Sequence, residues 1–246
     1  IMVEPMFKMI YASQPKVGEF LTLGGSEGKH AVAVRRVRQG ESIQFSNGSG
    51  LRVRAIVETL QQGSLTAKIV EVIQEDEPTV RLTLIQALAK GDRDELAVQA
   101  ATELGCYAVV PWQAERSISR WEGPKVNKGV ERWQTIVAEA AKQALRAYEP
   151  KVEQPLSSAA LASKISEYDR VLVLEPTAAD GLGEISQLPG SVAIIVGPEG
   201  GISEAELKLF ESAGASRVHL GKSILRTSTA GVAAISVLQA KLGLWG

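Results

Sequence analysis

Residues 194–206 read IIVGPEGGISEAE. A short apolar run ends in a loop with three glycines, and then Ser203 and Glu206 have the spacing of a capping box at the start of a helix. A strand, a glycine-rich turn and a helix in this order are typical of a parallel sheet, in which ligands bind beyond the carboxyl ends of the strands. Glycine would let the backbone approach such a ligand closely, although an ordinary turn between a strand and a helix has the same spacing.

The same alternation extends over residues 79–246. Apolar runs typical of strands lie at 81–89, 108–110, 170–174, 192–196 and 217–220. Helical patterns lie between them or after them, at 94–104, 130–147, 204–213 and 229–241. This rhythm predicts an α/β domain with a mostly parallel sheet.

Residues 1–75 follow a different pattern, in which short apolar runs at 17–23, 42–45, 51–57 and 64–72 are separated by turn signals. The run 51–57 alternates apolar and polar residues, which places Arg52 and Arg54 on one solvated face of a strand. We expect these strands to form a small β-barrel. The acidic stretch 75–78, which ends in proline, is typical of a linker between this domain and the next.

Composition excludes several classes of function. The 246 residues include 27 lysines and arginines, 28 aspartates and glutamates, one cysteine and two histidines, and 45% are hydrophobic. This is the composition of a folded protein, and it provides neither a disulfide framework nor a Cys/His cluster for a metal. The sequence shows no secretory signal pattern and no apolar run long enough to span a bilayer, so we expect a cytoplasmic protein with no membrane partner.

Positive charge is concentrated in two places. Within residues 29–54, six cations oppose the single carboxylate of Glu41, and they are Lys29, Arg35, Arg36, Arg38, Arg52 and Arg54. A basic face on a small barrel fits contact with RNA phosphates, although a solvated face would have the same composition. In a second stretch, the cations Arg116, Arg120, Lys125, Lys128 and Arg132 are interleaved with Trp112, Trp121 and Trp133. Tryptophan can stack on bases but is also an ordinary core residue.

Residues 220–230 form a second candidate loop, which leads from a strand into an apolar helix. Thr227 or Ser228 could cap this helix. Arg226 is a cation just before the helix, where it opposes the helix dipole, and we therefore expect it to be held there for a ligand. His219 is expected to be a core histidine, and Cys106 is expected to be buried and unreactive.

Other known loops and catalytic sets do not fit. Residues 197–201 lack the G-x-G-x-x-G order of a dinucleotide site. Residues 221–223, GKS, would need a glycine at position 216 to form a P-loop, and that residue is Ser216. Residues 24–30 fail the same test and are expected to form a turn. The chain also lacks the nucleophile elbow of α/β hydrolases.

Seven short segments occur in an order that identifies a family. They are KGDR at 90–93, TELG at 102–105, ERS at 115–117, ERW at 131–133, EAAKQ at 139–143, GPEGG at 197–201 and LGKSILRTSTA at 220–230. Together with residues 30–40 they resemble the RsmE family of bacterial 16S rRNA (uracil-N3)-methyltransferases of the SPOUT superfamily, over nearly the whole chain. Two positions depart from the family pattern, because Ala100 stands where a lysine is expected and Ser228 where a glutamate is expected.

The resemblance implies an N-terminal PUA-like barrel that binds RNA, and a C-terminal SPOUT domain whose trefoil knot binds S-adenosylmethionine. It implies a homodimer that acts on 16S ribosomal RNA within the small ribosomal subunit. By position, the cofactor loops would contain Leu174, Glu175 and Pro176; Gly197, Pro198, Glu199, Gly200, Gly201 and Ile202; and Leu220, Gly221, Ile224 and Leu225.

For catalysis, our hypothesis is that Arg226, with Arg116, hydrogen-bonds the uracil carbonyls and stabilises the charge that develops on the base. Arg146 is a further candidate for RNA contact. Two alternatives remain open from the sequence, namely a SPOUT 2′-O-ribose methyltransferase and a non-catalytic RNA-binding assembly factor.

Overall fold

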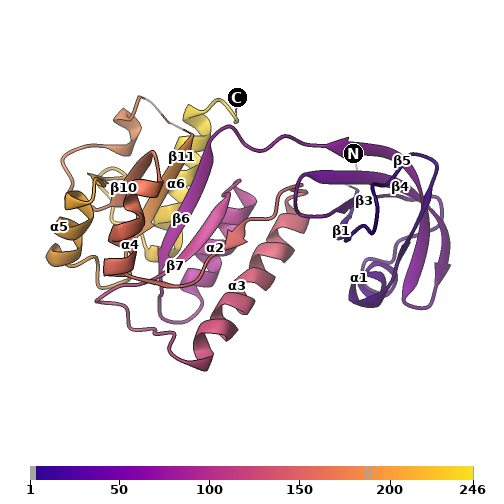
Figure 1. Cartoon of the computed structure of the whole chain (residues 1–246), viewed down its shortest axis with the longest axis horizontal. Coiled ribbons are helices and arrows are strands. Elements are labelled where there is room, and N and C mark those ends of the chain that lie inside the picture. The colour runs from indigo at the N-terminus through magenta and orange to yellow at the C-terminus, as the bar shows by residue number, and fades with distance from the viewer. Residues whose placement is uncertain (1–3, 187, 189, 246) are drawn as a thin grey trace. The chain divides into compact units, whose positions relative to one another are not determined.

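The computed structural model describes residues 4–186, 188 and 190–245 (Figure 1). The chain divides into two compact units. The first unit consists of Ile1–Glu77 and Ala141–Glu149, and the second consists of Pro78–Ala140 and Pro150–Gly246.

The first unit is built on a five-stranded sheet with the order β1-β3-β4-β5-β2. Its strands are β1 (Met6–Lys8), β2 (Phe20–Leu23), β3 (Ser42–Ser46), β4 (Leu51–Gln61) and β5 (Ser64–Gln74). β1 is parallel to β3 and the other pairs are antiparallel. Alternate residues of β4 and β5, including Val53, Val57 and Leu65, join Phe7 and Phe45 in one core. The strands expected within residues 17–72 are confirmed; β1, only three residues long, gave no periodic signal in the sequence.

The expected turn at residues 24–30 is wrong, because this segment forms the short helix α1 (Gly25–Lys29), followed by a π-helical turn at His30–Val34. Gly28 explains how the helix fits. A Cβ atom there would lie 2.6 Å from the backbone oxygens of both Leu23 and Gly63. The helix therefore needs a glycine where it packs against β2 and the β4–β5 turn. In the sequence, the glycines of this segment had indicated only a turn.

Residues Ala141–Glu149 pack with the first unit although they lie far along the chain. The Tyr148 hydroxyl donates a hydrogen bond to the carbonyl of Glu75 at 2.9 Å, and Lys142 pairs with Glu27 at 2.8 Å. Gly50 leaves room for the Tyr148 side chain, since a Cβ atom at position 50 would lie 2.4 Å from the Tyr148 hydroxyl oxygen. No periodic pattern in the sequence predicts this association.

The second unit contains an all-parallel sheet with the order β12-β10-β11-β6-β7-β8, and β9 also pairs with β7. The strands are β6 (Arg81–Ala87), β7 (Ala108–Gln113), β8 (Lys151–Val152), β9 (Leu156–Ser157), β10 (Arg170–Leu174), β11 (Ser191–Val196) and β12 (Ser216–Val218). The helices are α2 (Arg93–Glu103), α3 (Pro124–Gln143), α4 (Ser158–Lys164), α5 (Glu204–Ser212) and α6 (Thr227–Lys241), with single 3-10 turns at Ile165–Glu167 and Leu182–Glu184. The predicted α/β fold with a mostly parallel sheet is confirmed.

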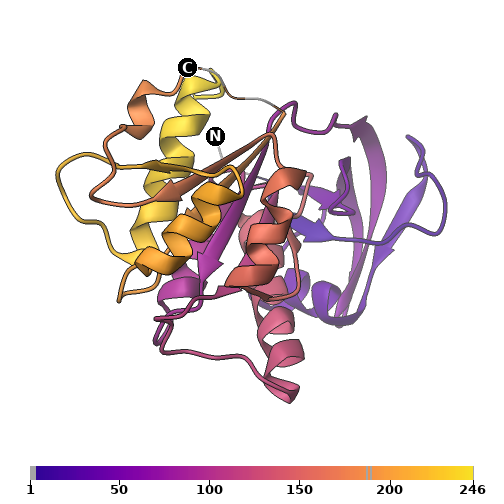
Figure 2. The ribbon, with the colours of Figure 1, turned by 60° about the vertical axis from the view of Figure 1, so that its left-hand side comes forward.

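Helices cover both faces of this sheet (Figures 1 and 2). α2 and α6 pack together on one face, and α4 and α5 cover the other. Neighbouring residues of β11 belong to the hydrophobic cores on opposite faces of the sheet. Ile194 packs on the face covered by α6, and Ile195 packs on the face covered by α5. Burial on both faces explains why these strands are continuous apolar runs in the sequence.

Parallel pairing brings the carboxyl ends of β10, β11 and β12 to one edge of the sheet. There the segment after β10 lies against the segment after β12. The amide of His219 donates to the carbonyl of Asp180 at 2.9 Å, and the carbonyl of His219 accepts from the amide of Leu182, also at 2.9 Å. Three loops that are far apart in sequence therefore meet at one place.

Gly28 provides a test of the close packing in the first unit. Substitution Gly28→Ala should lower the free energy of unfolding by about 1–3 kcal/mol, because the new methyl group has no space between two backbone carbonyls. This loss should exceed the gain of about 1 kcal/mol in helix propensity. The measurement is urea unfolding followed by circular dichroism. Gly183→Ala, where a Cβ atom meets nothing within 4 Å, is the control and should change stability by less than about 0.5 kcal/mol. Equal stability of the two variants would contradict the packing argument.

Candidate active site

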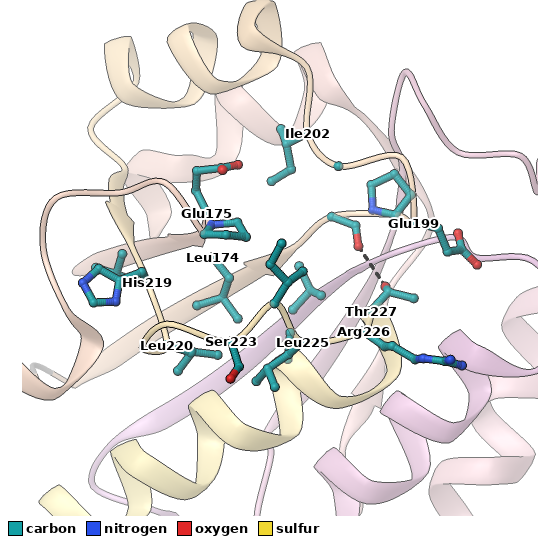
Figure 3. Close-up of a pocket in the computed structure, with 18 of the residues that line it drawn as sticks. Leu174, Glu175, Glu199, Ile202, His219, Leu220, Ser223, Leu225, Arg226 and Thr227 are labelled. Atoms are coloured by element: carbon teal, nitrogen blue, oxygen red, sulfur yellow. Dashed lines mark hydrogen bonds between the residues drawn. The ribbon is translucent and has the colours of Figure 1, made fainter.

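A pocket of about 320 Å³ lies at the carboxyl edge of the sheet in the second unit (Figure 3). It is formed by the loops after β10, β11 and β12 and by the first turn of α6. The lining includes Leu174, Glu175, Pro176, Gly197, Pro198, Glu199, Gly201, Ile202, His219, Leu220, Gly221, Ser223, Ile224, Leu225, Arg226 and Thr227, together with Arg93 of α2. Of the thirteen residues expected in the cofactor loops, Gly200 alone lies outside this lining.

The lining combines apolar side chains with polar groups near its ends. Leu174, Ile202 and Leu225 contribute apolar surface. Figure 3 shows His219 at one end of the pocket and Glu199 and Arg226 toward the other. Pockets of this kind, mostly apolar with a few placed polar groups, are typical of sites for small molecules.

The loop after β11 folds tightly because of its glycines. A Cβ atom at Gly197 would lie 2.7 Å from Cγ1 of Ile202, so the chain can double back only with glycine there. Gly201 has a φ angle of 71°, a conformation that glycine adopts readily. Its amide donates to the carbonyl of Pro198 at 2.9 Å and closes the turn. The glycine spacing noted in the sequence therefore shapes one wall of the pocket.

The predicted capping box is confirmed. The Ser203 hydroxyl accepts from the amide of Glu206, whose carboxylate accepts from the amide of Ser203 at 3.1 Å. Glu206 also accepts hydrogen bonds from the amide of Glu115 at 2.7 Å and from the hydroxyl of Ser158 at 2.6 Å. Burial favours the neutral acid, but these hydrogen bonds outweigh burial and lower the pKa of Glu206. One buried carboxylate thus joins α5, α4 and the loop after β7.

The contacts of Glu115 with Glu206 and Ser203 place the next residue, Arg116, against the glycine loop. Its Nη1 donates to the carbonyl of Gly200 at 3.0 Å, and the adjacent Glu115 accepts a hydrogen bond from the Ser203 hydroxyl at 2.6 Å. Arg116 is exposed and lies beside the pocket rather than in its lining. A network that the sequence did not indicate therefore places Arg116 beside the pocket that Arg226 lines.

Thr227 and Ser228 do not cap α6. The N-cap is Arg226, and Thr227 is the first helical residue. The Thr227 hydroxyl instead donates to the carbonyl of Gly197 at 2.8 Å (Figure 3) and accepts from Nε2 of the fully buried Gln86 at 2.8 Å. The expectation of capping is wrong because this hydroxyl has a partner on another loop, and it holds two walls of the pocket together.

Residues 90–93 hold the side chain of Glu199 in place. Its carboxylate accepts from the amide of Lys90 at 3.1 Å and from Nη1 of Arg93 at 2.9 Å. Partial burial raises the pKa of Glu199, but hydrogen bonds from its own backbone, from Lys90 and from Arg93 outweigh this effect and lower it. The KGDR segment at 90–93 therefore acts as a clamp on the GPEGG loop, and Glu199 stays ionised at neutral pH.

His219 is not a core residue, which corrects the sequence-based expectation. β12 ends at Val218, so His219 lies in the loop beyond it, lines the pocket and is partly exposed. Its Nδ1 accepts from the amide of Gly221 at 3.0 Å. The apolar neighbours in the sequence suggested a longer strand than the chain forms. Cys106 is buried, as expected.

The basic residues expected on the first unit differ in their surroundings. Lys29, Arg35, Arg36 and Arg38 are exposed and lie in or just after α1 and the π-helical turn. Arg52 and Arg54 lie on the outer face of β4, as predicted, but Arg52 pairs with Glu75, and Nε of Arg54 lies 2.9 Å from Glu71. Arg146 is partly buried within Ala141–Glu149. Strand pairing places Glu71 of β5 and Glu75, directly after β5, beside Arg54 and Arg52.

Two further features bear on function. No group of three or more His, Cys, Asp or Glu side chains in the described ranges is arranged to hold a metal ion. No helix among the described residues is long and apolar enough to cross a membrane.

Comparison with known proteins agrees with the fold. A family model described as an RNA methyltransferase domain matches residues 75–239, and one described as an RNA methyltransferase PUA domain matches residues 23–70. The two models define the class of protein: an RNA methyltransferase domain with a PUA domain before it.

Relatives and solved structures narrow the class. Ribosomal RNA small subunit methyltransferase E of Mycobacterium bovis is 39% identical, with 94% of this chain and 90% of the relative covered, and that of Bacillus subtilis is 31% identical with 88% of each covered. The crystal structure of ribosomal RNA small subunit methyltransferase E from Neisseria gonorrhoeae, bound to S-adenosylmethionine, superposes with a TM-score of 0.86 at 32% identity over 99% of each chain. A methyltransferase of Legionella pneumophila in complex with the same cofactor has a TM-score of 0.86 at 29% identity, over 97% of this chain and 98% of that one. The chain belongs to the ribosomal RNA small subunit methyltransferase E family, which confirms the resemblance seen in the sequence.

The Glu206 network leads to a pH-dependent prediction. Because its pKa is lowered in the folded protein, ionised Glu206 stabilises the fold above the unfolded pKa of about 4.3, and this contribution is lost as pH falls through the folded pKa. Glu206→Gln should lower the free energy of unfolding by about 2 kcal/mol at pH 7, since charge-assisted hydrogen bonds are lost. The difference from wild type should shrink below about pH 4.

Urea unfolding at several pH values measures this difference. The control is Glu204→Gln, an exposed carboxylate in the first turn of the same helix, which should cost less than about 1 kcal/mol. A Glu206→Gln difference that stays constant from pH 7 to pH 3 would contradict the assigned role.

Proposed function

We propose that this protein transfers a methyl group from S-adenosylmethionine to N3 of a uridine in the 16S ribosomal RNA of the small ribosomal subunit. The observation that carries the proposal is the pocket formed by the loops after β10, β11 and β12, in a family whose solved members from Neisseria gonorrhoeae and Legionella pneumophila are described with this cofactor. The uridine N3 position follows from the sequence resemblance alone.

The pocket fits such a cofactor. Its volume of about 320 Å³ is in the range of small-molecule sites, and Leu174, Ile202 and Leu225 supply apolar surface for an adenine ring. The glycine-rich turns expose backbone groups that can hydrogen-bond the polar parts of the ligand. We assign cofactor contact to the loops predicted from the sequence: residues 174–176, 197–202, 220–221 and 224–225.

The bound cofactor supplies an electrophilic methyl group on a sulfonium. The chain's own contribution is to hold the base and stabilise negative charge. As uracil N3 takes the methyl group it gives its proton to solvent water, and the negative charge that develops on the base is shared with the carbonyl oxygens. Arg226 lines the pocket, is exposed, and has no carboxylate partner among the residues that the structure describes. We assign Arg226 and the neighbouring Arg116 as donors to these oxygens.

For RNA binding, we propose that residues 1–75 form the main recognition domain and residues 79–246 the catalytic domain. Lys29, Arg35, Arg36 and Arg38 are the strongest candidates for phosphate contact because they are exposed. Arg52 and Arg54 would contribute less, since each is paired with a glutamate, and Arg146 would contribute from Ala141–Glu149.

We also propose that the second unit contains a trefoil knot and that the protein is a cytoplasmic homodimer. The hydrogen bonds of His219 with Asp180 and Leu182 support the knot, because they pin the segment after β10 against the segment that leads into α6. The homodimer is proposed from the sequence resemblance alone.

The experiment that tests the function is transfer of radiolabelled methyl groups to small-subunit particles from a strain that lacks the enzyme, followed by analysis of the nucleosides. We expect label in 3-methyluridine. Label in a 2′-O-methylated nucleoside would instead establish a ribose methyltransferase. The absence of transfer, together with the absence of cofactor binding in calorimetry, would establish a non-catalytic RNA-binding factor.

Arg226→Ala tests the catalytic assignment. The loss of one donor to a developing anion costs about 3 kcal/mol, so kcat should fall by roughly 100-fold. Calorimetric affinity for S-adenosylmethionine should stay within about threefold of wild type. Lys222→Ala, an exposed cation four residues earlier in the same loop, is the matched control and should keep kcat. Wild-type turnover of Arg226→Ala at saturating RNA and cofactor would show that the assignment is wrong.

A further inference from the structure

A second cavity, of about 380 Å³, lies wholly within the second unit between the start of α2 and the first turns of α3. We call it the α2–α3 cavity. Its walls include Gly91, Asp94, Arg120, Trp121, Lys125 and Lys128. None of these residues lines the candidate active site, so the cavity needs its own explanation.

Trp121 provides an aromatic surface in this cavity. Its indole packs against Gly129, where a Cβ atom would lie 2.5 Å from the ring, and it meets the buried Trp133 edge-on with ring centres 5.2 Å apart. A glycine inside a helix costs about 1 kcal/mol relative to alanine. Gly129 thus lowers the stability of α3 at the position where the Trp121 ring packs. Trp121 itself is partly exposed and lines the cavity.

The charge of the cavity is positive. Lys125 and Lys128 are one turn apart on α3, and Arg120 precedes the helix. No ion pair of either lysine is found within the described part of the chain. The other cation, Arg132, is neutralised by Glu95 at 2.7 Å.

Asp94 is the remaining carboxylate of the cavity. It is buried, and its two oxygens accept from the backbone amides of Ala89 and Glu95. Burial raises the pKa of Asp94 to about 6. Three cations therefore face one carboxylate that is already hydrogen-bonded to the backbone.

The α2–α3 cavity adjoins the candidate active site. Gly91 and Asp94 line the cavity, while Arg93, between them, lines the active-site pocket and holds Glu199. A chain bound across residues 90–93 would thus reach both places. This arrangement suits a polymer whose reacting unit occupies the pocket while a neighbouring unit occupies the cavity.

We propose that the α2–α3 cavity binds an unpaired nucleotide of the RNA substrate, next to the one that reacts. Its base stacks on Trp121, and Arg120, Lys125 and Lys128 contact its phosphates. The inference rests on the proposed function, because it assumes an RNA substrate. It adds an RNA contact within the catalytic domain, separate from the basic residues of the first unit.

The first test measures binding of a fluorescein-labelled polyuridylate oligonucleotide and of deproteinised 16S rRNA by anisotropy over a range of salt concentrations. For the double variant K125Q/K128Q, affinity should fall, and the slope of log K against log salt should decrease in magnitude by about 1 to 1.5, since each single-strand phosphate contact contributes about 0.7. The matched control is K164Q/K208Q, two exposed lysines of α4 and α5, which should leave affinity and slope unchanged.

The second test separates stacking from charge. Trp121→Leu keeps an apolar side chain against Gly129 but removes the ring, and it should weaken RNA binding roughly 5- to 100-fold. Trp121→Phe keeps a ring and should retain most of the affinity. Thermal melting of both variants shows whether the fold is intact, and the lysine variants test the cavity even if Trp121→Leu does not fold.

Three results would overturn the proposal: unchanged affinity and salt slope in K125Q/K128Q, an equal loss in the control variant, or a shift in sedimentation velocity showing that the lysines hold a second copy of the chain. Failure of the proposed function is distinct from these results. It would appear as absence of methyl transfer by the wild-type protein, whose RNA binding could still be compared with that of the variants.

Discussion

The pocket depends on the hydrogen bond from the Thr227 hydroxyl to the carbonyl of Gly197. This contact joins the loop after β11 to the start of α6, and Gln86, inside the sheet, holds the same hydroxyl from behind. A buried donor or acceptor left without a partner costs about 1–3 kcal/mol, so these groups resist separation. Because Arg226 directly precedes Thr227, the position of the proposed catalytic cation follows from this contact.

A second set of contacts fixes the opposite wall. Glu206 receives hydrogen bonds from Ser158, Ser203 and the amide of Glu115, and the residue after Glu115 holds the carbonyl of Gly200. The glycine loop is thus supported from α4, α5 and the loop after β7. Glycine gives this loop its shape, and neighbouring side chains remove the mobility that glycine would otherwise leave, so the backbone groups are already placed for a ligand.

The sequence predicted the features that depend on local pattern. The parallel strands followed from continuous apolar runs, and the capping box followed from the spacing of Ser203 and Glu206. What it missed depends on contacts between distant segments: the hydroxyl of Thr227 bonds to another loop, and Glu71, on a neighbouring strand, neutralises Arg54. His219 was misjudged for a related reason, because apolar neighbours cannot show where the pairing of a short edge strand stops.

The cations of the second unit differ in whether a carboxylate neutralises them. Arg132 of α3 and Arg217 of β12 each lie within 2.7 Å of a glutamate carboxylate. Arg226 and Lys125 instead stand at the starts of α6 and α3, where the helix dipole disfavours a cation by about 0.3–1 kcal/mol. A polyanionic substrate reverses the sign of this effect, since the helix amides and the side-chain cations then attract the same ligand. Charges that are unfavourable in the free protein would therefore become favourable in the proposed complex with RNA.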